Sequence, residues 1–516
     1  MKDKTGVEPP APKNFDLLKD KEPEPLRQEA IGLIGVLLLT VTGAAPLTAM
    51  LGNIPFAVGF GNGAHVPATF LVATVVLTIF SVGYAAMATQ ISSAGGFYTF
   101  ISLGLGREAG MSAGLASLIA YSLFEAALSG IFAFFANTFV SNHFGFNIPW
   151  LYLALFSITL CGALSYFDIS LSAKVLGVAL ILEVLVLLVF DAAVVTGVPG
   201  THFSLESMNI LNVMSDVPSQ KIGKVTIPAG SAPVGIFMAF WSWCGFEMAP
   251  SYAEESIDPK RNIPRSLYFS VIALGIFFTL TSWCAVSAFA DDDRMLVMAV
   301  SDSGNFFIEP MRHFVGSMGA STMSLLILSS TFACGMAFHN TAARYLYSLA
   351  REGVFPTALG HTHPYYKSPH VASITQSLLA FFWVIPFAYF SGTDAPNEQA
   401  YLGVYTMLAT LGTMLLLILQ AFVSLAILVY FKTKNKAGRI EFSTFIAPAF
   451  SFFSLAALVY LLVAKLDTFG GVGAFGSKIP HVVVAVIIVG FVWGAILRIT
   501  TPAVYARIGR LLYTKD

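Results

Sequence analysis

Long apolar stretches recur through this chain, and polar residues, glycines or prolines separate them. A helix needs about 20 predominantly apolar residues to cross the hydrocarbon core of a bilayer. Twelve stretches are of this kind, at residues 31–51, 67–89, 109–138, 148–167, 171–197, 232–252, 264–290, 315–346, 371–390, 400–430, 444–464 and 480–500. Charged residues make up 11% of the chain, against about 25% in soluble domains. The sequence therefore predicts an all-α polytopic membrane protein with 12 transmembrane helices.

The distribution of basic residues predicts the orientation in the membrane. With residues 1–30 in the cytosol, only six of the 28 Lys and Arg residues lie outside, namely Lys221, Lys224, Arg294, Arg312, Lys465 and Lys478. Loops on the cytosolic side carry the excess of Lys and Arg. We therefore expect a multi-pass plasma-membrane protein with both termini cytosolic. Residues 1–30 mix charges with five prolines and lack the apolar core of a signal peptide, which predicts a disordered tail.

Several functions are excluded by composition and motifs. A net charge of −1 without a basic stripe argues against a nucleic-acid partner. The four cysteines lie in apolar stretches without CxxC spacing, so we expect buried thiols and no metal site. The chain contains no HExxH motif, and its one GxSxG match, at residues 110–114, lies inside a predicted membrane helix rather than at a strand-to-helix turn, so neither an enzyme nor a cofactor is predicted.

Two of the apolar stretches are interrupted at matching places. The first contains Thr42-Gly43-Ala44-Ala45-Pro46, and the sixth contains Trp241 to Gly245, followed by Glu247 and Pro250. Glycine and proline are common in membrane helices, so either interruption alone carries little weight. The two together, one in each five-helix half, are typical of inverted-repeat transporters, in which unwound backbone binds the substrate.

Three acids lie alone in apolar surroundings, at Glu125, Glu183 and Glu247. An acid at the centre of a membrane helix costs about 3 kcal/mol on insertion scales, so we expect each to face the protein interior. Glu125 is interpreted as a contact to a cationic substrate, a proton site or a structural hydrogen-bond partner. Glu183 is a candidate proton or cation site, or a helix-packing partner. Glu247 follows an interruption and is a candidate for proton coupling.

Four sequence blocks resemble the amino acid–polyamine–organocation permeases, and the resemblance extends over nearly the whole chain. The blocks are GAAPLT at 43–48, SAGGFY at 93–98, the segment from Gly245-Phe246-Glu247 through Glu254-Glu255 to Arg265, and NTAARYLYSLAREGVFP at 340–356. The resemblance implies the leucine-transporter fold of five plus five inverted helices. It divides the chain into a tail at 1–30, a ten-helix transport core at 31–430 with repeats at about 31–197 and 232–430, helices 11 and 12 at 431–500, and a cytosolic tail at 501–516.

The resemblance also implies a substrate site between the first, third, sixth, eighth and tenth helices. The substrate carboxylate would meet the backbone at Thr42, Gly43, Ala44 and Ala45. The amino group would meet backbone carbonyls at Trp241 and Cys244, beside Gly245, with Trp241 as an aromatic lid. Phe338, Glu125 and Ser129 would line the side-chain pocket.

Two departures from the family pattern bear on mechanism. The first interruption reads Thr-Gly-Ala-Ala-Pro where most members have Gly-Ser-Gly or a similar sequence, and Glu183 stands where many exchangers have lysine. The sequence predicts a secondary active transporter for an amino acid, with a slight preference for cationic ones because of Glu125, or for a related amine. Proton coupling would use Glu183 or Glu247. The alternatives are a polyamine permease, a substrate–product exchanger, and, from a different class, a transport-dead sensor or ion channel.

Overall fold

The computed structural model describes residues 31–91, 95–166, 169–197, 201–253, 255–390, 398–434, 441–466 and 473–509. The tail predicted at residues 1–30 lies outside the described residues, as do residues 510–516 of the second predicted tail.

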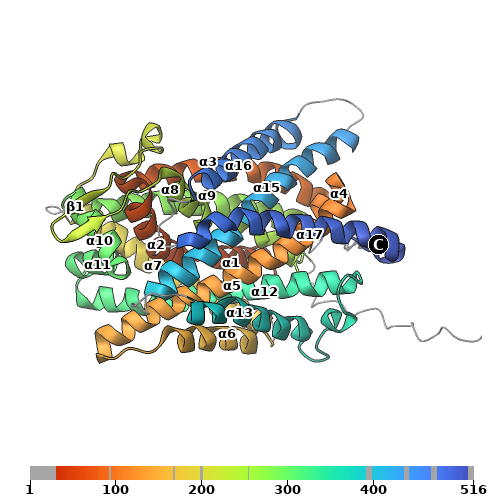
Figure 1. Cartoon of the computed structure of the whole chain (residues 1–516), viewed down its shortest axis with the longest axis horizontal. Helices are drawn as coiled ribbons and strands as arrows, with labels where there is room; N and C mark the ends of the chain where they lie inside the picture. The colour runs from red at the N-terminus through yellow and green to blue at the C-terminus, as the bar shows by residue number, and fades with distance from the viewer. Residues whose placement is uncertain are drawn as a thin grey trace, which may run out of the picture.

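The described chain is a bundle of long helices that run roughly along the longest axis of the molecule (Figure 1). These helices are α1 (Leu33–Ala44), α2 (Pro46–Ala57), α3 (Val66–Gln90), α5 (Arg107–Phe144), α6 (Trp150–Ser165), α7 (Ile169–Thr196), α8 (Ala232–Ser242), α9 (Pro259–Ser287), α12 (Ser317–Arg351), α13 (His370–Phe390), α15 (Thr406–Lys434), α16 (Ala447–Ala464) and α17 (Ile479–Thr500). Two irregular helical segments matter for the site, η6 (Phe246–Tyr252) and η9 (Gln399–Tyr405).

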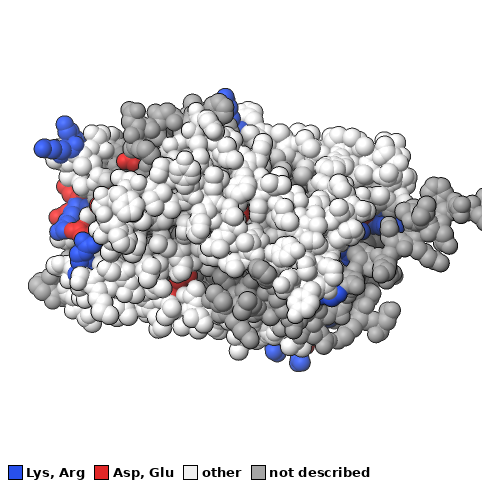
Figure 2. Space-filling model, turned by 90° about the horizontal axis from the view of Figure 1, so that it is seen from below, with Lys and Arg blue, Asp and Glu red and all other residues white. Residues whose placement is uncertain are grey.

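Among the described residues, nine helical segments are long and apolar enough to cross a membrane. One of them, Leu33–Gln90, runs through two of the predicted stretches. The predicted fourth stretch forms the 16-residue helix α6, and the sixth is divided between α8 and η6. Figure 2 shows a broad middle band with few charged side chains, while Lys, Arg, Asp and Glu gather at the end that holds β1, α10 and α11. The chain is therefore a multi-pass helical membrane protein, as predicted.

Short elements that the sequence analysis did not predict lie between the long helices. They are α4 (Phe97–Leu105), α10 (Asp292–Ser301), α11 (Ile308–Phe314), α18 (Pro502–Arg507) and the antiparallel strands β1 (Gln220–Ile222) and β2 (Val225–Ile227). The hairpin turns through Gly223, whose φ of 58° suits a two-residue turn. Asp291 caps the start of helix α10, since its side chain accepts a hydrogen bond from the Arg294 backbone N–H at 2.7 Å.

Helix α5 lies at the centre of the bundle and packs against α4, α6, α12, α15 and α17. Small residues allow this close packing: a Cβ on Gly130 would lie 2.9 Å from the carbonyl oxygen of Ala400. Most of α5 is buried, whereas α17 exposes most of its surface at the rim. A residue in the middle of α5 therefore faces other helices whichever way it points.

Candidate functional site

The first interruption separates α1 from α2 at a single residue. Ala45 adopts φ 39° and ψ 79°, a left-handed conformation that costs roughly 1 kcal/mol for a residue with a Cβ. Pro46 is the first residue of α2, a position where a missing N–H leaves no hydrogen bond unmade. The helix therefore breaks inside the sequence where the interruption is predicted.

The second interruption lies between α8 and η6, and it touches the first. Gly245 has φ 120°, and a Cβ placed there would lie 2.5 Å from the carbonyl carbon of Gly43. A Cβ on Gly43 would in turn lie 3.2 Å from Cα of Gly245. Only glycine allows the two backbones to approach this closely. The two interruptions are about 200 residues apart in the chain but lie in direct contact in the structure.

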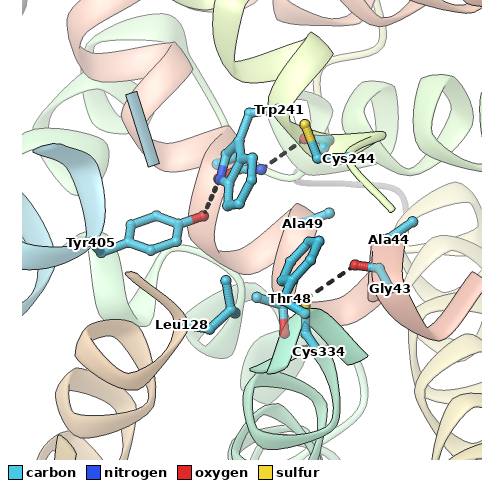
Figure 3. A pocket seen from close by; sticks show the side chains of 12 residues that line it. Gly43, Ala44, Thr48, Ala49, Leu128, Trp241, Cys244, Cys334 and Tyr405 are labelled. Atoms are coloured by element: carbon cyan, nitrogen blue, oxygen red, sulfur yellow. Dashed lines mark hydrogen bonds between the residues drawn. The ribbon is translucent and has the colours of Figure 1, made fainter. Parts of the chain in front are cut away.

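A small cavity lies beside the two interruptions (Figure 3). The volume that the centre of a water molecule can occupy is about 10 Å³, so the cavity has room for a single water. Residues from the first, third, sixth, eighth and tenth predicted stretches line it, together with Asn53 just beyond the first stretch. The lining residues are Gly43, Ala44, Thr48, Ala49, Asn53, Leu128, Trp241, Ser242, Cys244, Cys334, Phe338 and Tyr405. None of these twelve described residues is charged, and all are buried. The cavity is closed in this conformation.

Trp241 forms one wall of the cavity and is held by a chain of polar groups. Its Nε1 donates to the Tyr405 hydroxyl at 2.8 Å, and that hydroxyl bonds the side-chain oxygen of Asn53 (Figure 3). The Asn53 amide donates to Ser242 at 2.8 Å. The indole also contacts the rings of Phe124 and Phe338, with centroids 4.6 and 6.1 Å away. Trp241 is therefore positioned by α2, α5, α12 and η9 together.

Of the predicted binding residues, five line the cavity, namely Gly43, Ala44, Trp241, Cys244 and Phe338. Thr42, Ala45 and Gly245 lie at the interruptions but do not line it. Ser129 donates to the Ala126 carbonyl of its own helix at 2.7 Å. Glu125 also lies away from the cavity, and its carboxylate bonds His339 of α12 and Gln376 of α13.

Glu247 is fully buried and holds the second interruption together. One carboxylate oxygen accepts a hydrogen bond from the backbone N–H of Gly245, and the other accepts from the Tyr121 hydroxyl, both at 2.9 Å. The carboxylate thus satisfies a backbone donor that the helix break has freed and ties it to α5.

Glu183 lies against the first interruption. Its carboxylate accepts a hydrogen bond from Ser330 of α12 at 2.7 Å, and it also interacts with the backbone N–H of Leu47. The Ser330 oxygen in turn lies 2.8 Å from the Thr48 hydroxyl and accepts from the Thr48 N–H at 3.2 Å. Leu47 and Thr48 are in the first turn of α2, where N–H groups have no partner within the helix. Glu183 and Ser330 therefore serve as a cap on α2.

Two of the sequence blocks that carry the family resemblance meet near the ends of η6 and α12. Arg344 donates to both carboxylate oxygens of Glu255, at 3.0 and 3.1 Å, and its guanidinium lies 5.0 Å from the Tyr252 ring centroid. All three side chains are buried. This buried pair joins the chain that follows the second interruption to α12.

The residues that the sequence analysis missed are mostly uncharged polar side chains, such as Asn53, Ser242 and Tyr405. Ser242 and Tyr405 lie in apolar stretches without an adjacent glycine, proline or charge, and Asn53 lies just beyond the first predicted stretch beside Gly52, a residue type that is common in membrane helices. A polar residue in a membrane helix was the only available signal, and the many hydroxyls in these helices that bond their own backbone give the same signal.

Comparison with known proteins identifies the family. Residues 31–500 match the amino acid permease family. The low-affinity putrescine importer PlaP of Escherichia coli (strain K12) is 24% identical over 359 residues, which cover 68% of this chain and 74% of that protein. The branched-chain amino acid permease BcaP of Bacillus subtilis (strain 168) is 22% identical over 365 residues, covering 66% of this chain and 69% of the relative. BcaP of Lactococcus lactis subsp. cremoris is 23% identical over 378 residues, covering 67% and 75%. The match covers most of the chain, and this protein therefore belongs to the amino acid permease family, a family of membrane transporters rather than enzymes.

Proposed function

We propose that this protein is a secondary active transporter that carries an amino acid across the plasma membrane by alternating access. The observation that carries the proposal is the contact of two helix interruptions, Gly43 against Gly245, beside a closed cavity. Interrupted helices that meet at mid-membrane offer free backbone groups to a substrate that has both a carboxylate and an ammonium group. An amino acid has both.

The proposed architecture has twelve spans, with a ten-helix core at 31–430 in two inverted repeats, and helices 11 and 12 at 431–500. The nine long apolar segments support it, since Leu33–Gln90 contains two of the predicted stretches. The short helix α6 and the pair α8 and η6 supply two further ones. Both termini would lie in the cytosol, on the side of the buried Arg344–Glu255 pair.

We propose that the substrate is a neutral amino acid. Leu128 and Phe338 are large apolar side chains available to its side-chain end, and none of the twelve described lining residues is charged. A cationic side chain, or the second ammonium of putrescine, would be buried there without a carboxylate, which is costly. The cationic preference predicted from the sequence relied on Glu125, and Glu125 is bonded to His339 at 2.9 Å instead.

In this proposal the substrate carboxylate binds the backbone at Thr42 to Ala45, and the ammonium group binds the carbonyls of Trp241 and Cys244. The cavity must enlarge to admit them, because its present room is that of a single water. Trp241 is the lid that moves, and its bond to Tyr405 breaks as the site opens towards the outside.

Glu183 is the proposed proton-coupling group. It binds a proton on its carboxylate and becomes neutral, which removes an anion from the first turn of α2, where an anion is favoured. Among its described partners, the Ser330 hydroxyl can donate to the charged carboxylate or accept from the neutral carboxyl, and the Leu47 N–H can donate to a carboxyl oxygen in either state. Proton binding at Glu183 would therefore change the stability of the helix start at the first interruption, where the substrate binds. Glu247 is the second candidate.

Uptake into proteoliposomes tests the function. The panel contains labelled leucine, alanine, lysine and putrescine, each with and without an inward proton gradient. We expect uptake of a neutral amino acid that collapses when the gradient is dissipated. Uptake of putrescine alone would overturn the substrate proposal and support a polyamine permease, in keeping with the name of one relative. Gradient-independent uptake that requires internal substrate would establish an exchanger and remove the role of Glu183.

A further inference from the structure

A buried polar cluster joins α5, α12 and α13 behind the cavity. Glu125 of α5 lies 2.9 Å from Nδ1 of His339 of α12, and Nε2 of that histidine lies 2.8 Å from the hydroxyl of Ser373 of α13. The second Glu125 oxygen accepts from the Gln376 amide at 2.8 Å. Each of these four side chains is at most 1% exposed. The cluster therefore makes specific bonds between three helices at a depth where water does not compete.

The sequence neighbours of this pair are aromatic: Phe338 lines the cavity, and Phe124 of α5 packs against Phe338. Phe124 precedes Glu125, and Phe338 precedes His339. The two phenylalanine rings contact each other with centroids 5.0 Å apart, and both contact Trp241. Successive residues of a helix point about 100° apart, so a residue that faces the cavity has a neighbour that faces the next helix. The Glu125–His339 bond thus lies directly behind the contact between Phe124 and Phe338.

We propose that Glu125 and His339 are positioning residues that set the width of the substrate cavity. Their bond holds α5 to α12 at the level of Phe124 and Phe338, and so fixes the wall against which the substrate side chain packs. That the substrate is an amino acid rests on the proposed function, but the effect of this pair on the width of the cavity does not depend on that proposal. A polar pair suits this task better than apolar packing, because a hydrogen bond allows one separation and one orientation, while apolar side chains slide.

The surroundings of the pair are consistent with a fixed role rather than an exchangeable site. The buried thiol of Cys161 of α6 lies near Glu125. Both imidazole nitrogens have partners, and both carboxylate oxygens have partners. Neither residue lines the cavity that holds the proposed substrate.

The test uses the double variant Glu125→Leu/His339→Leu, which removes the bond without leaving a lone buried charge. Glu125→Gln is measured in parallel. It keeps the shape of the side chain but places an amide opposite the Gln376 amide that donates to the carboxylate. His339→Gln is the conservative variant that still donates to Glu125. Ser112→Ala is the matched control, because Ser112 also lies on α5 and bonds a neighbouring helix, at 2.7 Å to the carbonyl of Ile487.

The first readout is the rate at which a small thiol reagent labels Cys244 and Cys334, which line the cavity, measured by peptide mass spectrometry. We expect labelling to be at least about fivefold faster in the double variant and about twofold faster in Glu125→Gln, with His339→Gln and Ser112→Ala unchanged. Equal labelling in all folded variants would overturn the proposal. This readout needs no substrate, so it stands even if the protein transports something other than an amino acid.

The second readout is the KM and maximal rate of uptake across neutral amino acids from alanine to phenylalanine. We expect the double variant to raise the KM for small substrates about tenfold, to favour larger ones, and to change the maximal rate less than about twofold. A fall in maximal rate at constant KM would also overturn the proposal, because it would assign the pair to the transport cycle rather than to the shape of the cavity.

Discussion

Glu183 and Glu125 are each a lone acid in an otherwise apolar helix, and the sequence gives them the same appearance. The structure gives them different partners. Glu183 meets the Ser330 hydroxyl, which can donate to a charged carboxylate or accept from a neutral carboxyl, and the Leu47 backbone N–H at the start of α2. Glu125 meets Nδ1 of His339 with one oxygen and accepts from the Gln376 amide with the other, so both of its oxygens are bonded. The first environment suits a group that changes its protonation during transport, and the second suits one that keeps its bonds.

The strongest test of this difference is Glu183→Gln. The amide keeps the shape of the side chain but cannot bind and release a proton. We expect accumulation of substrate driven by a proton gradient to fall at least about tenfold, while exchange of internal for external substrate continues. The measurement is accumulation against counterflow in the same proteoliposomes. Normal accumulation in this variant would show that coupling takes place elsewhere, with Glu247 as the next candidate.

The same substitution at Glu125 should have the opposite signature. Glu125→Gln weakens the bond to His339, so we expect the KM for the transported amino acid to rise about threefold while the accumulation ratio stays within about twofold of the wild type. Initial rates over a range of substrate concentrations, with and without the gradient, separate the two effects. Loss of accumulation with unchanged KM would mean that Glu125 takes part in coupling and that the comparison fails.

Ser330→Ala sharpens the role of Glu183. The Ser330 hydroxyl connects the Glu183 carboxylate to Thr48, and a hydrogen bond to a charged group contributes about 1.5–3 kcal/mol. We expect accumulation to fall about threefold to fivefold, less than in Glu183→Gln, because the proton site itself remains. Ser324→Ala is the control, since Ser324 lies on the same helix and bonds only the Ala320 carbonyl in the described structure. Equal losses in both variants would indicate general damage to α12.

Features that depend on local sequence could be predicted for this protein, and features that depend on contacts between distant helices could not. The apolar helices and the interruptions at Ala45 and Gly245 depend on local composition, so they could be predicted. The partners of Glu125 could not, because 214 residues separate it from His339 and the contact depends on how two helices are rotated. Successive residues of α5 point about 100° apart, so Phe124 contacts Trp241 and Phe338, which line the cavity, while Glu125, which the sequence analysis placed in the pocket, faces away from it.

The smallest effect is expected at the far end of the Glu125 cluster. Ser373→Ala removes the hydroxyl that bonds Nε2 of His339 at 2.8 Å but leaves the Nδ1 bond to Glu125 intact. If the pair acts by holding α5 to α12, the KM should change less than about twofold, because Ser373 is on α13 and does not bridge those two helices. Thermal unfolding in detergent should still report the lost bond as a fall of a few degrees. A KM change as large as that of Glu125→Gln would mean that the width of the cavity depends on α13 as well, and the positioning role would then belong to the whole cluster rather than to the pair.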